Sequence, residues 1–222
     1  MSFVNHLKDA FIANSNAEFA TQMKSYMRNQ FEFYGIKTKL RRDLLKTSVA
    51  HFKDDINKDI RSISKELFIA PYRELHHCGV ELFEKQLRKK YHKNDIHQIE
   101  FFITTNSWWD TVDFIAKQIL GAYLKQFPEE TETIIYRFSA SKNMWLNRSA
   151  ILFQLGYKNQ TDEVLFYNLC LQHRNSDEFF IQKAIGWALR EYGKTNPESV
   201  LRFVQSNTLK PLSEREAIRN LI

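Results

Sequence analysis

The segment SWWDTVDFIAKQIL at 107–120 decides the fold, because two later segments begin in the same way at a similar spacing. These counterparts are NMWLNRSAILFQL at 143–155 and DEFFIQKAIGWALREY at 177–192. Each starts with a polar residue that can cap a helix and continues with apolar residues at helical spacing. In the first segment, Ser107 and Asp110 form the S-x-x-D pattern of a capping box. The three segments therefore predict three equivalent helices.

The same signal extends toward the N-terminus. KLRRDLLKTSVAHF follows a threonine, and PYRELHHCGVELFEKQLRKK opens on a proline, which suits the first turn of a helix. The helix starts are separated by 33, 36, 36 and 34 residues and lie at Thr38, Pro71, Ser107, Asn143 and Asp177. A second series has separations of 34, 33 and 35 residues and lies at Asn94, Pro128, Thr161 and Asn196 with Pro197.

The two interleaved series predict stacked units of two helices each. A helix pair over residues 3–31 precedes them, and a capping helix that starts at Ser213 follows, with a second capping box closed by Glu216. One such unit cannot bury its apolar stripe alone, so the units must stack. We therefore expect an all-α fold, an α-solenoid of antiparallel helix pairs (HEAT-like repeats) with a concave basic groove, as a single domain over residues 1–222. An ordinary helical bundle is the alternative.

Composition narrows the protein class. The 222 residues include only 6 Gly and 4 Pro, too few for a sandwich or barrel with many hairpins. Apolar residues at 43% suffice for a core and exclude disorder as the main description. Cys78 and Cys170 form no C-x-x-C pair, which predicts core thiols in a reducing compartment. The charged N-terminus and the lack of a long apolar run favour the cytoplasm and no membrane span.

Charge suggests an anionic partner. Lys and Arg exceed Asp and Glu by 32 − 26 = 6, and the pI is about 9.2. In a solenoid, the first helix of each pair contributes to one wall. Indoles, a carboxylate and cations recur on this predicted wall, at Arg41, Arg42, Arg73, Trp109, Asp113, Arg148, Lys183, Trp187 and Arg190. This set favours a groove for nucleic acid.

Each candidate residue also has a simpler interpretation. Trp109 and Asp113 are four residues apart and share a helix face, but Asp113 could form an ordinary surface salt bridge. Trp108 points about 100° away from Trp109, so we expect one of the two in the core and the other outside. The cations Arg148, Lys183 and Arg190 could be ordinary solvated side chains.

Other chemistries find little support. No glycine-rich phosphate loop and no H-E-x-x-H motif occurs. His76 and His77 are neighbours, and neighbouring side chains on a helix diverge, so they predict no metal site. We therefore expect neither a metal nor a cofactor.

Four segments carry a family resemblance: YMRNQFEFYGIKTKLRR at 26–42, TTNSWWDTVDFIA at 104–116, NMWLNRSAILFQL at 143–155 and IQKAIGWALREYGKTNP at 181–197. Together they resemble the HEAT-like-repeat alkylpurine DNA glycosylases of bacteria, the AlkD-like DNA alkylation repair family. The likeness extends over nearly the whole chain, in order, and WWDTVD and IGWALREY are its most specific blocks.

The resemblance implies hydrolysis of the N-glycosidic bond of cationic N3- and N7-alkylated purines in duplex DNA, such as 3-methyladenine and 7-methylguanine. It places the catalytic aspartate at Asp113, the sugar-facing tryptophans at Trp109 and Trp187, and the arginine near the DNA backbone at Arg148. Tyr26 matches a tyrosine near the DNA groove. The resemblance also implies action from the sugar and backbone side, without a pocket for a flipped base.

Taken together, we expect a monofunctional glycosylase, since no lysine stands out as a Schiff-base nucleophile. We expect it to be a monomer in the bacterial cytoplasm that acts at the nucleoid. Lys183 and Arg190 add to the expected DNA contacts. The alternative is a non-catalytic DNA-binding HEAT-repeat protein that recognises distorted or branched DNA. A protein–protein scaffold is a third class, which the net charge and the indole–carboxylate cluster disfavour.

Overall fold

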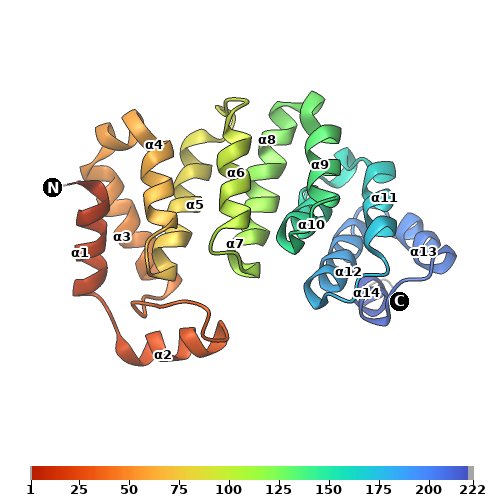
Figure 1. Cartoon of the computed structure of the whole chain (residues 1–222), viewed down its shortest axis with the longest axis horizontal. Coiled ribbons are helices and arrows are strands. Elements are labelled where there is room, and N and C mark those ends of the chain that lie inside the picture. The colour runs from red at the N-terminus through yellow and green to blue at the C-terminus, as the bar shows by residue number, and fades with distance from the viewer. Residues whose placement is uncertain (1, 220–222) are drawn as a thin grey trace. The chain divides into compact units, whose positions relative to one another are not determined.

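The chain is built from helices. The computed structural model describes residues 2–219, and in that range the only β-type pairing is an isolated bridge between Glu32 and Tyr72 (Figure 1). Two compact units, Met1–Lys90 and Tyr91–Ile222, make up the chain. The predicted all-α fold class is confirmed. The single domain predicted over residues 1–222 stays a prediction.

The first unit holds five helices among its described residues. They are α1 (Phe3–Ala13), α2 (Ala17–Tyr26), α3 (Thr38–His51), α4 (Lys53–Phe68) and α5 (Arg73–Leu87). α1, α3, α4 and α5 pack around a shared core, whereas α2 buries no side chain and lies crosswise below the lower ends of α3, α4 and α5 (Figure 1). The two helices expected over residues 3–31 are therefore present, but α2 does not pack along α1 as the second helix of a stacked unit.

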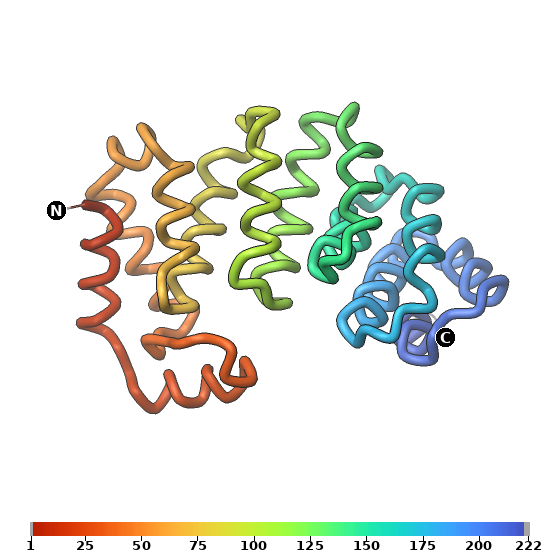
Figure 2. Tube along the Cα trace, viewed as in Figure 1, coloured from red at the N-terminus to blue at the C-terminus, as the bar shows by residue number. Residues whose placement is uncertain are grey.

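The second unit contains the remaining helices. In chain order they are α6 (Asp95–Thr104), α7 (Trp109–Phe114), the π-helix η1 (Ile115–Leu120), α8 (Gly121–Gln126), the short η2 (Pro128–Glu130), α9 (Thr131–Ser139), α10 (Met144–Leu152), the short η3 (Lys158–Gln160), α11 (Glu163–His173), α12 (Phe179–Gly193), α13 (Pro197–Ser206) and α14 (Pro211–Ile218). Successive pairs stack along this unit in an α-solenoid arrangement (Figure 2).

The first helices of the pairs contact one another in order. α10 packs against η1 on one side and against α12 on the other, while α9, α11 and α13 form the second layer. Apolar side chains fill the space between the two layers, for example Ile151, Phe166 and Ile185, each at most 3% exposed. The wall of first helices that the repeat spacing predicts is therefore present in the second unit.

The predicted helix starts are mostly right, but both capping boxes are wrong. α3 begins at Thr38, and the Asn143 side chain caps α10 by accepting the Trp145 amide at 2.9 Å. The Ser107 hydroxyl instead donates to the Ile103 carbonyl of the preceding helix, and Trp108 occupies the N-cap of α7. The last helix begins at Pro211, so Ser213 lies inside it.

Two further expectations concern the core and the membrane. Cys78 and Cys170 are free, buried thiols, as expected. Burial raises the pKa of the Cys78 thiol to about 11. No helix among the described residues is both long enough and apolar enough to cross a membrane.

Candidate active site

Asp113 lies on a helix with unusual winding. α7 begins at Trp109, and Asp113 follows one turn later. Directly after α7, η1 has π-type winding, and the Gly121 amide donates to the Ala116 carbonyl five residues earlier. π turns inside helices are rare and occur frequently at functional sites. The backbone next to Asp113 is therefore a candidate functional segment.

Arg148, on α10, forms a bidentate ion pair with the Asp113 carboxylate on α7. Its Nε donates to Oδ1 at 2.7 Å, and its Nη2 donates to Oδ2 at 2.8 Å. The third guanidinium nitrogen, Nη1, donates to the backbone carbonyl of Phe180 at the start of α12. The planar fork of arginine fits a carboxylate in this bidentate way. The contacts of one arginine therefore connect α7, α10 and α12.

The pair is shielded from water. The Arg148 side chain is 5% exposed and that of Asp113 is 16% exposed. Burial raises the pKa of Asp113 above its ordinary value, and the hydrogen bonds and charge of Arg148 oppose that rise. Arg148 is therefore not the solvated side chain that the sequence left open. The salt-bridge interpretation of Asp113 is right about the ion pair, but Arg148 is buried and Asp113 is half-buried.

The carboxylate still has capacity to act on a substrate. An ionised carboxylate offers about four lone-pair sites on its two oxygens. Arg148 occupies one lone-pair site on each oxygen, which leaves the other sites available. The Asp113 side chain is 16% exposed, so part of it is accessible from solvent. The arrangement thus provides a preorganised negative charge whose direction is fixed by a buried cation.

Three aromatic rings lie beside this pair at the starts of three first helices. The ring centroids of Trp108 and Trp145 are 5.9 Å apart, and Phe180 lies 5.5 Å from Trp108 and 5.1 Å from Trp145. The guanidinium carbon of Arg148 is 5.9 Å from the Phe180 ring. The Trp108 indole N–H is buried and finds no hydrogen-bond partner among residues 2–219. This aromatic cluster braces the helix starts that position Arg148.

The two candidate tryptophans are both half-buried. Trp109 is one turn before Asp113 on the same face of α7. Trp187 is seven residues after Phe180 on α12, so it lies on the same side of that helix, and it packs partly on the core. Trp108 is also half-buried, so the expected division into one core and one exposed indole at 108 and 109 is wrong.

Lys183 and Arg190 share a single carboxylate on the last helix. The Lys183 Nζ is 3.0 Å from Glu216 Oε1, and Arg190 Nη1 is 2.6 Å from Glu216 Oε2. The two cations lower the pKa of Glu216 to about 2, through their hydrogen bonds and charge. The Lys183 side chain remains 38% exposed and that of Arg190 is 21% exposed. Lys183 is the more accessible of the two for a phosphate.

Comparison with known proteins assigns the family. The profile of the DNA alkylation repair enzyme family matches residues 7–221. This chain belongs to that family. Comparison with curated proteins finds no match. The chain is similar to a solved structure from Enterococcus faecalis described as a predicted DNA alkylation repair enzyme, with a TM-score of 0.86 and 30% identity over 93% of this chain and 96% of that one.

Several cations that the sequence places on the wall of this repair enzyme are not available to DNA. Arg41 is buried, and its Nη2 donates to Glu81 at 2.7 Å, while Arg73 is completely buried beneath the Phe31 ring. Arg42 also pairs with Glu81 but keeps an exposed side chain. Arg41 and Arg73 therefore stabilise the first unit, and their predicted place in a groove is wrong.

Tyr26 is exposed at the end of α2 in the first unit. Its side chain is 71% exposed, and the left-handed residues Arg28 and Asn29 turn the chain directly after it. The predicted DNA contacts of Tyr26, Arg148, Lys183 and Arg190 stay predictions. Within residues 2–219, no group of His, Cys, Asp or Glu is placed to hold a metal ion.

Sequence reasoning missed Glu216 and Phe180 as members of this site. The S-x-x-E pattern predicts Glu216 as a helix cap, whereas its carboxylate pairs with Lys183 and Arg190. The repeat period offers a signal for the central pair, since Asp113 and Arg148 are 35 residues apart, one repeat length. Equivalent positions in adjacent repeats lie side by side.

Proposed function

We propose that this repair enzyme is a monofunctional DNA glycosylase that hydrolyses the N-glycosidic bond of cationic N3- and N7-alkylated purines. The observation that supports it best is the half-buried Asp113 carboxylate, clamped in bidentate fashion by Arg148, one turn from Trp109. A fixed negative charge next to an indole suits a reaction that develops positive charge on a sugar. Membership in the DNA alkylation repair enzyme family supports the same substrate class.

The proposed chemistry needs no general acid. An alkylated purine carries positive charge, and it becomes neutral when it takes the electron pair of the C1′–N bond. The deoxyribose left behind has oxocarbenium character, as in other glycoside cleavages. Asp113 stabilises this positive charge and orients a water molecule, whose oxygen forms the new bond to C1′. The carboxylate accepts the proton that the water releases, and burial favours this by raising the pKa of Asp113.

The indoles add to this stabilisation. In the proposal, the faces of Trp109 and Trp187 lie against the deoxyribose, where each contributes cation–π attraction of about 0.5–2 kcal/mol. Arg148 has the further role of setting the direction of the carboxylate, because all three of its guanidinium nitrogens have protein acceptors. These bonds use three of the five guanidinium N–H groups, so the proposed contact of Arg148 with a DNA phosphate is made through the other two.

DNA is held through its backbone in this proposal. Lys183, Arg190 and Tyr26 contact phosphates or sugars, and the base needs no pocket. The partner is duplex DNA with alkylated purines, bound by one copy of the chain in the bacterial cytoplasm. Backbone contacts of this kind fix position without reading sequence.

The decisive experiment measures release of 7-methylguanine and 3-methyladenine from methylated duplex DNA. The Asp113→Asn variant keeps the shape but loses the charge, and we expect a loss of about 10²–10³-fold in kcat, as for other preorganised electrostatic groups. Asp110→Asn, three residues earlier on the same helix, is the matched control and retains activity. If Asp113→Asn and Asp110→Asn lower kcat equally, Asp113 is not the carboxylate that stabilises the charge on the sugar.

The same assay separates the non-catalytic alternative. If the unaltered protein releases no base but binds four-way junctions more tightly than linear duplex, it is a binder of distorted or branched DNA. A glycosylase of the proposed kind has no need to prefer junctions.

A further inference from the structure

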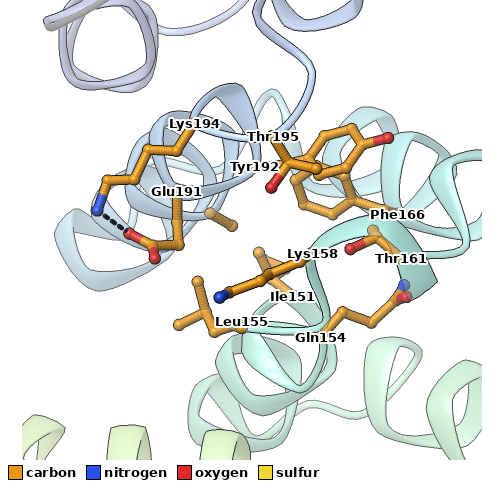
Figure 3. A pocket seen from close by; sticks show the side chains of 12 residues that line it. Ile151, Gln154, Leu155, Lys158, Thr161, Phe166, Glu191, Tyr192, Lys194 and Thr195 are labelled. Atoms are coloured by element: carbon orange, nitrogen blue, oxygen red, sulfur yellow. Dashed lines mark hydrogen bonds and ion pairs between the residues drawn. The ribbon is translucent and has the colours of Figure 1, made fainter.

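A cavity of about 310 Å³ lies in the second unit, and none of the residues that line it belongs to the candidate active site (Figure 3). The end of α10, the start of α11 and the end of α12 surround it. This volume is within the range of sites that hold small molecules. Neither base excision nor DNA binding, as proposed above, uses it.

The floor of the cavity is apolar and preformed. Ile151, Leu155, Phe166 and Ala188 line it, and each is at most 6% exposed. The Tyr192 ring forms part of the wall, while its hydroxyl is already occupied in donating to Glu163 at 2.8 Å. An occupant therefore needs an apolar body to fill this space.

The mouth of the cavity is polar and carries a surplus cation. Lys194 is 2.5 Å from Glu191, so these two charges compensate each other. The Lys158 ammonium has no carboxylate partner among residues 2–219, and its side chain extends across the cavity in Figure 3. Thr161 and Thr195 add hydroxyl groups to the lining. One unpaired ammonium beside hydroxyls suits a single negative charge.

The backbone holds Lys158 at this mouth in an unfavourable conformation. Its φ is +55°, in the left-handed region that a lysine rarely adopts, and Gly156 two residues earlier has φ +88°. The Gln154 side chain fixes the loop, because its Oε1 accepts the Asp162 amide at 2.7 Å and its Nε2 donates to the Asp162 carbonyl at 3.2 Å. Tyr157 anchors the loop by donating to the Gly121 carbonyl at 2.6 Å. Such strain persists where the surrounding structure imposes it, and it concentrates at ligand sites.

From these observations we infer that the cavity binds a small amphipathic monoanion, an apolar body that ends in one carboxylate. The body lies on Ile151, Leu155 and Ala188, and the carboxylate meets the Lys158 ammonium at the mouth. This inference does not depend on the proposed glycosylase activity.

The test titrates octanoate into the intact protein. Isothermal titration calorimetry measures the affinity, and NMR chemical shifts of the backbone amides locate the site. We expect saturable binding of one octanoate per chain, with shifts centred on Gly156 and Thr195. Acetate lacks the apolar body and 1-octanol lacks the charge, so both bind much more weakly. Inorganic phosphate tests whether the cavity is only a site for small anions. We expect it to leave the chemical shifts of these amides unchanged.

Two variants test the two halves of the site. Lys158→Gln weakens octanoate binding roughly tenfold or more, the effect of losing one charge-assisted hydrogen bond. Lys142→Gln changes another exposed lysine of the same unit and leaves the affinity unchanged. Ala188→Leu fills the floor and abolishes binding, with circular dichroism to show that the variant is folded. Lys158→Gln folds regardless, because this side chain is exposed.

Three results would overturn the inference. They are no octanoate binding at millimolar concentration, equal affinities for octanoate and 1-octanol, or an affinity that Lys158→Gln leaves unchanged. If phosphate alone shifts these amides, the cavity mouth is a site for simple anions, and the inferred amphipathic ligand is wrong.

Discussion

At the scale of single residues, the Asp113–Arg148 pair shows how burial and charge compete at one carboxylate. Burial raises the pKa of Asp113, and the bidentate contact with Arg148 limits the rise. A carboxylate with a raised pKa is a better proton acceptor once it is ionised, but it is lost to protonation at a higher pH. The pH dependence of base release therefore reports on this pair directly.

We predict that base release at saturating DNA falls with decreasing pH along a limb whose midpoint lies above 3.8, the ordinary value for the pKa of an aspartate. Arg148→Gln removes the charge that opposes protonation, so the pKa of Asp113 rises and the limb moves to higher pH. The measurement is kcat against pH, corrected for spontaneous depurination. A variant that loses activity with an unmoved limb would show that Arg148 acts only by binding DNA.

The burial of Arg148 also marks a limit of sequence reasoning. A lone arginine among helix-forming residues has no local pattern that separates a solvated side chain from a buried one. Its partner Asp113 is on another helix, and its second acceptor is the backbone carbonyl of Phe180. Every residue has such a carbonyl, so the residue type at 180 does not predict this contact. A shared helix face and the family resemblance both indicate Asp113 and Trp109, and their roles stay predictions.

At the scale of elements, α12 and α14 pack unusually closely. A Cβ at Gly186 would lie 2.5 Å from Glu216 Cβ and 2.8 Å from the Ser213 carbonyl oxygen. The Ser213 hydroxyl donates to the Gln182 carbonyl at 3.0 Å, which holds the two helices in this register. Glycine at 186 is therefore required by the approach of α14, not by the conformation of α12.

We predict that Gly186→Ala destabilises the protein by about 1–3 kcal/mol, as overpacking of a buried contact does. The alanine side chain pushes α14 away from α12, although alanine is the better helix former. Thermal unfolding checks this, with Gln205→Ala on an exposed face of α13 as the control. An unchanged or raised melting temperature would contradict the contact.

The ion pairs of Glu216 predict a second, pH-dependent effect on α14. Lys183 and Arg190 lower the pKa of Glu216 from 4.5 to about 2. The folded state therefore binds this proton less readily than the unfolded chain, so the stabilisation is complete above pH 4.5 and is lost as the pH falls toward 2. Glu216→Gln lacks it at any pH. The difference in melting temperature between protein and variant should shrink across that window, and a constant difference would refute the assignment.

The helix boundaries show what local patterns can and cannot predict. Asn143 and Asn196 mark helix starts correctly, because each side chain accepts a backbone amide two or three residues later in its own helix. The S-x-x-D and S-x-x-E patterns fail at Ser107 and Ser213, because each hydroxyl donates to a carbonyl outside its own helix. The pattern is the same in both situations, and only tertiary packing decides between them.

At the scale of the whole molecule, the count of 32 lysines and arginines overstates the positive charge available to DNA. Arg41 and Arg148 are buried in ion pairs, and Lys183 and Arg190 share Glu216. A cation whose charge is already compensated by a carboxylate displaces fewer counterions from DNA when it meets a phosphate than an unpaired cation does. The salt dependence of DNA affinity is therefore a better measure of the proposed interface than the formal charge.

We predict that affinity for undamaged duplex falls steeply between about 50 and 200 mM salt, and that Lys183→Ala lowers the slope of log K against log salt by about 1. Lys183 has the exposed part of its side chain free to meet a phosphate, whereas Arg190 is more enclosed, so Arg190→Ala should change the slope less. Fluorescence anisotropy with labelled duplex measures both. Arg202→Ala, on the exposed face of α13, is the control for general charge, since its side chain is exposed and, among residues 2–219, pairs only with Glu198 of its own helix. If Arg202→Ala lowers the slope as much as Lys183→Ala, affinity follows total charge and the proposed contact at Lys183 is wrong. If only Lys183→Ala lowers it, DNA lies along the face of α12 that also holds Trp187, which is the placement that the proposed chemistry requires.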